Sequence, residues 1–112
     1  QPGDLPLTHY PIIVMDLSFI SLRKVIVAAW AFLSEGGHLI ALAKPQFEAT
    51  KEEADRGKGI IRDEAVRART LEEVKTFVAK NLPAAQLFAE TESPIRGAEG
   101  NVEYFLVWKN NR

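Results

Sequence analysis

Residues 12–45 decide the fold of this chain, and they read IIVMDLSFISLRKVIVAAWAFLSEGGHLIALAKP. The first of them, 12–15, are apolar at every position, which is typical of a strand that is covered on both faces. Residues 38–44 form a second, largely apolar run, and Pro45 closes it because proline cannot donate to a strand ladder. Two such strands with a long segment between them predict a parallel pair.

The segment between these strands is predicted to be a helix. Ser21 is its predicted N-cap, and apolar residues recur from Leu22 to Leu33 at the spacing of an amphipathic helix. Gly36 and Gly37 are predicted to end the helix in the manner of C-cap glycines. A strand, a helix and a strand in succession favour an α/β sheet with right-handed crossovers.

The second half of the chain continues this alternation. Residues 45–62 are predicted to form a long polar loop, within which 49–56 could form one or two helical turns. A helix is predicted over 63–80, with its first residue as N-cap, and strands are predicted over 85–91 and 101–109. The first three strands are expected to be parallel. The fourth is expected to be antiparallel, because it follows the third by a short connection.

Three charged residues fall at one edge of this predicted sheet. Asp16 directly follows the first strand, Lys44 ends the second, and Glu103 lies near the start of the fourth. Ligands in α/β sheets bind beyond the carboxyl ends of the parallel strands, which is the edge that these residues share. If the fourth strand is inserted between the second and the third, Glu103 lies one strand spacing, about 4.8 Å, from Lys44. If it lies outside the third, no such site forms.

The composition sets limits on the function. With 112 residues the chain is one domain or a part of one, and a hydrophobic content of 46% is enough for a core. A net charge of -1, from 14 basic and 15 acidic residues, excludes a strongly basic nucleic-acid-binding protein but not a local basic patch. The absence of cysteine excludes a disulfide framework and a cysteine nucleophile. Neither a membrane-spanning run nor an export signal is visible, so a cytoplasmic location is expected.

Four short strings indicate a family. In chain order they resemble strings of the hemolysin A (TlyA) group, relatives of the FtsJ/RrmJ ribose 2'-O-methyltransferases: DLSFISL at 16–22, KPQFE at 44–48, KGIIRD at 58–63 and SPIRGAEGNVEYFL at 93–106. The resemblance covers about residues 11–108. It implies an α/β fold that is half of a Rossmann-like S-adenosylmethionine-dependent methyltransferase domain. In this half, one antiparallel strand is inserted between the second and third of three parallel strands, and two main helices lie on one face.

The resemblance also implies a reaction and a site. The family transfers a methyl group from S-adenosylmethionine to a ribose 2'-oxygen of ribosomal RNA with a Lys-Asp-Lys-Glu tetrad. Asp16, Lys44 and Glu103 match its last three members. Lys44 would act as the base, Asp16 would orient it near the sulfonium end of the cofactor, and Glu103 would hold the lysine in place. Asp16, Leu17 and Ser18 would contact the cofactor.

The match to the family is incomplete. The first lysine of the tetrad, the glycine-rich loop and acidic residue that bind the cofactor, and the small RNA-binding domain have no counterpart here. A lysine is a base only when neutral, and without the partner lysine Asp16 and Glu103 favour the charged form of Lys44. Residues 1–112 are therefore expected to be the C-terminal part of one methyltransferase domain, with no second domain. This part is expected to be inactive alone and to bind the cofactor weakly or not at all. The alternative is a non-catalytic RNA-binding or protein-interaction module that retains the half-fold.

RNA contacts are predicted from basic residues in the long loop and in the loop opposite it. These are Lys51, Arg56, Lys58, Arg62 and Arg96, which would contact phosphates without reading the sequence. The alternative is a solvated loop, because the acidic residues between them offset the charge. The two histidines have no third ligand beside them, so no metal site is predicted.

The predicted sheet leaves one surface uncovered. Right-handed crossovers place both helices on the same face, whereas the strands are apolar at successive positions and therefore on both faces. The first strand is also an open edge. We therefore expect the chain to self-associate through the bare face, on which Ile13 is expected, or through the first-strand edge, with or without exchange of an element. Poor solubility would be the other consequence.

Overall fold

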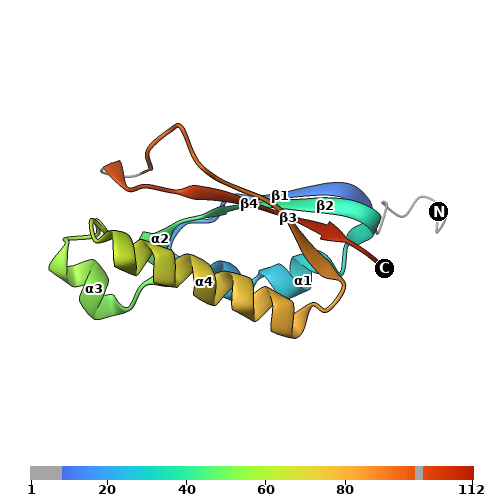
Figure 1. The fold of residues 1–112 in the computed structure, drawn as a ribbon, viewed down its shortest axis with the longest axis horizontal. Coiled ribbons are helices and arrows are strands. Elements are labelled where there is room, and N and C mark those ends of the chain that lie inside the picture. Colours follow the sequence, from blue (N-terminus) through green and yellow to red (C-terminus); the bar gives the residue numbers. More distant parts are fainter. Residues whose placement is uncertain (1–8, 98–99) are drawn as a thin grey trace, which may run out of the picture.

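The computed structural model describes residues 9–97 and 100–112, which form a four-stranded mixed sheet lying over a layer of helices (Figure 1). In chain order the elements are β1 (Tyr10–Met15), the 3-10 helix η2 (Leu22–Lys24), α1 (Ile26–Trp30), β2 (Leu33–Ala43), α2 (Pro45–Glu48), α3 (Lys51–Arg56), α4 (Glu64–Asn81), β3 (Ala85–Glu92) and β4 (Tyr104–Asn110). No helix within the described ranges is long and apolar enough to cross a membrane.

The order of strands in the sheet is β1-β2-β4-β3. β1 runs parallel to β2, and β4 runs antiparallel to both of its neighbours, β2 and β3. The last strand therefore lies between the second and the third, which is the alternative that the family resemblance implied. Because β4 runs in the opposite direction, its start lies at the same edge of the sheet as the ends of β1 and β2.

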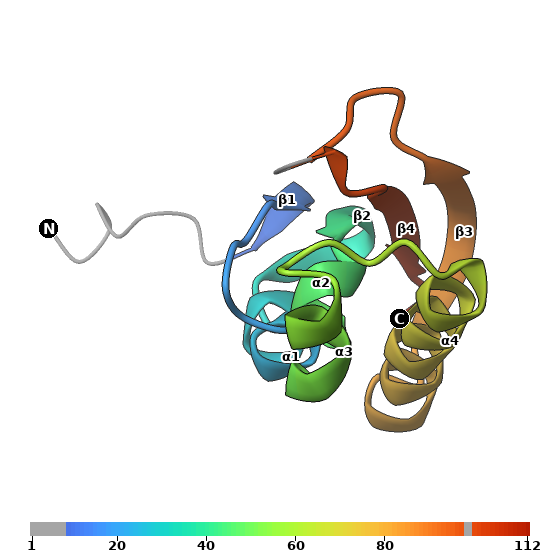
Figure 2. The same ribbon diagram turned by 90° about the vertical axis from the view of Figure 1, so that its left-hand side faces the viewer.

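All helices of the described residues lie on one face of the sheet (Figures 1 and 2). α4 runs beneath β3 and β4, whereas α1, α2 and α3 lie beneath β1 and β2 (Figure 2). The core fills the space between the layers, where Leu39 of β2 and Leu106 and Trp108 of β4 are buried together with Ile26 of α1 and Val74 of α4. Burial of these apolar side chains is the main force that holds the helices to the sheet.

The first helix is shorter than predicted. α1 ends at Trp30 and β2 begins at Leu33, so Gly36 and Gly37 lie inside a strand and the predicted helix C-cap is wrong. Gly36 has a φ of +74°, and a Cβ on Gly37 would lie 2.8 Å from the carbonyl oxygen of Pro11. The two glycines therefore permit an irregular start of β2 that packs closely against β1.

The predicted polar loop at 45–62 is largely helical, since it contains both α2 and α3. Thr50 caps α3 in a capping box with Glu53: the Thr50 hydroxyl accepts from the Glu53 amide at 3.2 Å, and the Glu53 carboxylate accepts from the Thr50 amide at 2.9 Å. α4 begins directly after its predicted N-cap, Asp63, whose carboxylate accepts a hydrogen bond from the amide of Ala65. The Glu53 side chain of α3 also accepts hydrogen bonds from Arg69, which holds this segment against the N-terminal half of α4.

The face of the sheet opposite the helices is apolar and open. Ile12 and Val14 of β1 are 60% and 66% exposed, and Phe88 of β3 is 64% exposed. Alternation along the strands places half-buried apolar residues on the same side, and we call the whole surface the open face: Ile12, Val14, Ile40, Leu42, Phe88, Phe105 and Val107. Ile13 instead packs against the core, so its predicted place on this face is wrong.

Candidate active site

Lys44 and Asp16 meet at the carboxyl edge of the sheet. Each directly follows its strand, β2 and β1 respectively, and the two strands are parallel neighbours. The Lys44 Nζ lies 2.7 Å from the Asp16 Oδ1, and it also donates to the Ser18 hydroxyl at 3.2 Å. The side chain of Lys44 is 11% exposed and that of Asp16 is 63% exposed. A lysine whose side chain is largely buried is thus paired with a carboxylate that remains open to solvent.

Glu103 lies beside this pair but does not form an ion pair with Lys44. It directly precedes β4, whose first residue, Tyr104, is paired with Ala43, so Glu103 and Lys44 are next to one another along the sheet edge. The buried Glu103 carboxylate instead accepts a hydrogen bond from the Gln46 Nε2 at 2.9 Å. The expected contact between Glu103 and Lys44 is therefore absent, because Lys44 turns toward the more exposed carboxylate of Asp16.

A cavity of about 390 Å³ joins these residues. This volume falls within the range of small-ligand sites, roughly 300–1,000 Å³. Its polar lining comes from both strand ends and from the loop between β3 and β4, and its apolar lining from aromatic and aliphatic side chains around them. The lining residues are Asp16, Ser18, Phe19, Leu42, Lys44, Gln46, Phe47, Ser93, Ile95, Arg96, Gly97, Glu103 and Phe105.

The loop between β3 and β4 closes over Glu103. A Cβ on Gly97 would overlap the Glu103 carboxylate, so the backbone of Gly97 packs directly on that group. The amide of Ser93 donates to the Glu103 carbonyl at 2.8 Å, and the amide of Gly97 donates to the Asn101 carbonyl at 2.8 Å. These contacts fix the backbone on both sides of the carboxylate.

The segment after β1 is held at two points by residues 44–48. Lys44 holds its start through Asp16, as described above. Glu48, a buried carboxylate, holds its end, where it accepts from the Ser21 hydroxyl at 2.5 Å and from the Leu22 amide at 2.7 Å. The strings at 16–22 and 44–48 therefore form one structural unit.

Phe19 stands at the mouth of the cavity, in the middle of this held segment. It is 89% exposed, and its backbone has a φ of +67°, which residues other than glycine rarely adopt. Its ring centroid lies 5.1 Å from that of Phe47. Leu17, two positions before Phe19, is partly buried and packs against the core. An exposed aromatic side chain in a strained conformation is a feature that often belongs to a binding site.

Of the five predicted RNA-binding residues, Arg96 alone lines this cavity, where its Nη2 lies 3.9 Å from the Glu92 Oε2. Arg56 and Arg62 line a separate cavity of about 240 Å³ between α3 and α4. Lys51 and Lys58 are exposed at the start of α3 and just after its end. Lys51 also lines a shallow cavity together with Phe19 and Phe47. The structure thus places Arg96 apart from the four basic residues of the 45–62 segment, as the two predicted loops imply.

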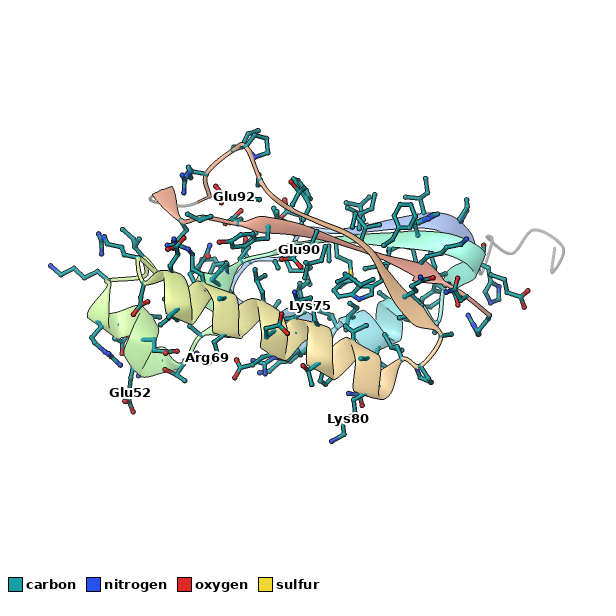
Figure 3. The ribbon with its side chains drawn as sticks, viewed as in Figure 1. Glu52, Arg69, Lys75, Lys80, Glu90 and Glu92 are labelled. Atoms are coloured by element: carbon teal, nitrogen blue, oxygen red, sulfur yellow. The ribbon has the colours of Figure 1, made fainter. Side chains whose placement is uncertain are left out.

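Two ion pairs fix the helices around these surfaces. Arg69 of α4 donates to both carboxylate oxygens of Glu53 at 2.6 Å, and this hydrogen bonding, with that of the Thr50 amide, lowers the pKa of Glu53 to about 2. Lys75 of α4 points to Glu90 of β3 at 2.7 Å (Figure 3), and the hydrogen bond to Glu90 is the main cause that raises the pKa of Lys75. The first pair ties α3 to α4, and the second ties α4 to the sheet.

A comparison with models of protein families identifies the family of this chain. The family model described as FtsJ-like methyltransferase matches residues 4–110. The chain belongs to the FtsJ-like methyltransferase family. The resemblance inferred from the four strings is therefore confirmed, and the mixed α/β sheet is that of a methyltransferase-like fold.

Individual FtsJ-like relatives are similar over most of this chain. It is 39% identical over 95 residues to the 16S/23S rRNA (cytidine-2'-O)-methyltransferase TlyA of Mycobacterium tuberculosis, a match to 85% of this chain and 34% of the relative. It is 38% identical over 96 residues to hemolysin A of Brachyspira hyodysenteriae, 83% of this chain and 38% of the relative. The chain thus spans about a third of the length of these relatives.

A solved structure agrees with these sequence matches. A protein from Lactococcus lactis, provisionally named a hemolysin, superimposes with a TM-score of 0.86 at 34% identity, over 96% of this chain and 50% of that chain.

Within residues 9–97 and 100–112, no group of three His, Cys, Asp or Glu side chains could hold a metal ion.

Proposed function

We propose that this chain forms part of an enzyme that methylates a ribose 2'-hydroxyl of ribosomal RNA, with S-adenosylmethionine as the methyl donor. The observation that carries the proposal is the Lys44–Asp16 ion pair in the wall of a cavity that Glu103 also lines. Family membership and the similarity to TlyA support it. Because the chain spans about a third of its relatives, we propose that activity requires residues beyond these 112.

The polar groups at the end of β1 are suited to contact one side of S-adenosylmethionine. When bound, this cofactor supplies an electrophilic methyl group next to a sulfonium cation. The Asp16 carboxylate is 63% exposed and lines the cavity, so it can face a cation, and the Ser18 hydroxyl lies beside it. Leu17, whose half-buried side chain packs against the core, lies between these two residues and can contribute its backbone. These residues form one wall of such a site, which supports weak binding by the chain alone.

Lys44 is the proposed base. Methyl transfer to a ribose hydroxyl requires that its proton be removed, and a neutral lysine amine within hydrogen-bond reach can accept it. The Lys44 Nζ lies in the cavity wall, where Asp16 and Ser18 fix its direction. Glu103 contributes a second carboxylate to the same cavity. Positioning of the hydroxyl against Lys44 is the part of the rate enhancement that this chain supplies.

The RNA is proposed to reach this cavity past Phe19. Nucleotides outside a duplex are recognised by stacking of their bases on aromatic side chains, and Phe19 with Phe47 presents such a surface at the cavity mouth. Arg96, in the cavity lining, is placed to contact a phosphate near the target. The more distant contacts are proposed to come from the other basic residues, Lys51, Arg56, Lys58 and Arg62.

A chimera tests this function. In it, this chain replaces the matching third of the M. tuberculosis TlyA. Labelled methyl groups from S-adenosylmethionine should be transferred to ribosomal RNA, and the product nucleotide should resist alkaline cleavage because its 2'-oxygen is blocked. A folded chimera that binds RNA without transferring methyl groups would instead support the alternative of a non-catalytic RNA-binding module.

A further inference from the structure

The amide of Gln46 links two parts of the cavity. Gln46 belongs to α2 and is 8% exposed, and its Nε2 donates to the Oε2 of Glu103 at 2.9 Å. Glu103 itself is 5% exposed. This hydrogen bond therefore lies away from bulk solvent, where a polar contact is stronger than at the surface.

The chemistry of the two groups fixes the orientation of the amide. A carboxylate only accepts hydrogen bonds, so the nitrogen of the Gln46 side chain must face Glu103 and the oxygen must point away from it. That oxygen, Oε1, is buried and accepts no hydrogen bond from any described residue. A buried acceptor without a donor destabilises a fold. An apolar side chain of similar length, such as methionine, would avoid this penalty, so packing alone does not account for glutamine here.

Gly97 holds the same carboxylate from another side. Its backbone lies so close that a Cβ there would overlap the carboxylate of Glu103. With the Gln46 amide on Oε2 and this backbone packed against it, the Glu103 side chain cannot turn without breaking a contact. The direction in which its carboxylate meets the cavity is therefore set by Gln46 and Gly97 together.

We propose that Gln46 is a positioning residue that fixes the Glu103 carboxylate in the active-site cavity. The expected effect on catalysis rests on the proposed methyl-transfer function. The hydrogen bond between Gln46 and Glu103 does not depend on it. Lys44 and Gln46 lie two positions apart and reach opposite walls of the cavity, Lys44 to Asp16 on β1 and Gln46 to Glu103 beside β4. One short segment thereby sets the distance between the two carboxylates.

The first test uses the 112-residue chain and hydrogen–deuterium exchange. Gln46→Met should accelerate exchange in the segment that carries Gly97 and Glu103, because the clamp on the carboxylate is lost. Gln46→Glu, which keeps the side-chain length but opposes Glu103 with a second carboxylate, should do the same. Gln86→Met is the matched control: Gln86 is exposed on β3 and its side chain accepts a hydrogen bond from Asn111. Unchanged exchange in both Gln46 variants would overturn the positioning role.

The second test uses the chimera. Gln46→Met should lower kcat about 10- to 100-fold, since misplacing a reacting group by about 1 Å can cost a factor of about 100. The KM for S-adenosylmethionine should stay within about twofold, because the lost contact is made to Glu103 and not to the cofactor wall. An unchanged kcat would overturn the kinetic role of Gln46. A chimera without any activity, combined with the predicted change in exchange, would refute the proposed function and leave the positioning of Glu103 intact.

Discussion

Lys44 is the residue on which the proposed chemistry depends most directly. Lys44→Ala in the chimera should lower kcat at least about 100-fold, the lower end of what a general base contributes. Lys44→Arg should be equally inactive, because arginine remains protonated and cannot accept the proton. Cofactor affinity should change little in either variant. The measurement is methyl incorporation under saturating cofactor.

The control for Lys44 is Lys80→Ala, because Lys80 is exposed in the last turn of α4 and lines no part of the active-site cavity. Figure 3 shows the Lys80 side chain extending away from the sheet. Turnover of Lys44→Ala close to that of this control would reject Lys44 as the base.

Glu48 tests the anchoring of the segment that carries Asp16 and Phe19. Glu48→Gln removes the charge and replaces one acceptor oxygen by a donor, so the hydroxyl of Ser21 or the amide of Leu22 loses its partner. An unsatisfied buried polar group costs about 1–3 kcal/mol, so the free energy of unfolding should fall by about that amount. Urea denaturation provides the measurement.

The exposed Glu52 of α3 offers the matched control for Glu48. Its side chain points away from the molecule (Figure 3), so Glu52→Gln should leave the stability within about 0.5 kcal/mol. Equal stability of the two variants would show that the Glu48 contacts do not anchor the segment.

At the scale of elements, the sequence predicted which residues lie at the carboxyl edge of the sheet. It did not predict which of their side chains pair with one another. Asp16 and Lys44 were expected to meet because the carboxyl ends of neighbouring parallel strands share an edge, and they do. The position of Glu103 follows from the same rule. Its partner does not, because strand alternation specifies a face and not the rotamer that turns Lys44 to Asp16. Gln46 lay two residues beyond Lys44, and no periodic pattern singled it out.

The helix boundaries failed for a different reason. The glycine pair at 36–37 was interpreted as a helix cap, but an αL glycine also suits an irregular strand, and close packing on β1 decided between the two. In the polar loop, the helical turns predicted within 49–56 are confirmed by α3, whereas α2 lies in a part that was predicted as loop. Thr50 followed three positions later by Glu53 is a capping box, which marks the start of α3.

The attachment of α3 to α4 should depend on pH. The Arg69 hydrogen bonds and the Thr50 amide lower the folded-state pKa of Glu53 from 4.5 to about 2. Because the pKa is depressed on folding, the ion pair stabilises the structure fully above pH of about 4.5, and this contribution is lost as the pH falls toward about 2. The protection of the α3 amides, measured as hydrogen exchange relative to the intrinsic rate at each pH, should therefore fall across that interval. In Arg69→Met this pH dependence should largely disappear, and an identical acid profile in the variant would contradict the assignment.

At the scale of the whole molecule, the cofactor should bind weakly to the chain alone. The described residues offer a carboxylate, a hydroxyl and one backbone stretch at the end of β1, which is one wall of a site for S-adenosylmethionine. A site that covers only one side of a ligand leaves much of the ligand's surface in water. Ligand pockets in proteins usually bury about 70–90% or more of the ligand's surface. Calorimetric titration of the 112-residue chain should therefore show no tight binding, and a low-micromolar dissociation constant would contradict this expectation.

The exposed apolar side chains of the open face favour association of the chain with other copies of itself. All helices of the described residues lie on the other side of the sheet (Figure 1). Of the open face, Ile12, Val14 and Phe88 are therefore exposed to water, and its other apolar side chains are half-exposed. β1 adds an edge strand without a charged residue, in which Pro11 and an irregular pairing between Tyr10 and Ile12 interrupt only the start. β3, at the opposite edge, carries Glu90 and Glu92 and has an irregular pairing near Phe88. Charges and bulges are the devices that prevent strands at an edge from pairing with other chains. We therefore propose that copies of this chain associate through the open face and the β1 edge.

Sedimentation at tens of micromolar should show this association, and a charge in the middle of the surface should reverse it. Val14 is 66% exposed on the open face, and Val14→Lys would place an ammonium in the contact, where it loses hydration without gaining a partner. Val27→Lys is the matched control, because Val27 is 44% exposed on α1, in the helix layer beneath the sheet. The wild type and the Val27 variant should sediment as oligomers and the Val14 variant as a monomer. A monomeric wild type would show that the exposed apolar side chains remain in water without a partner, and the proposed interface would be rejected.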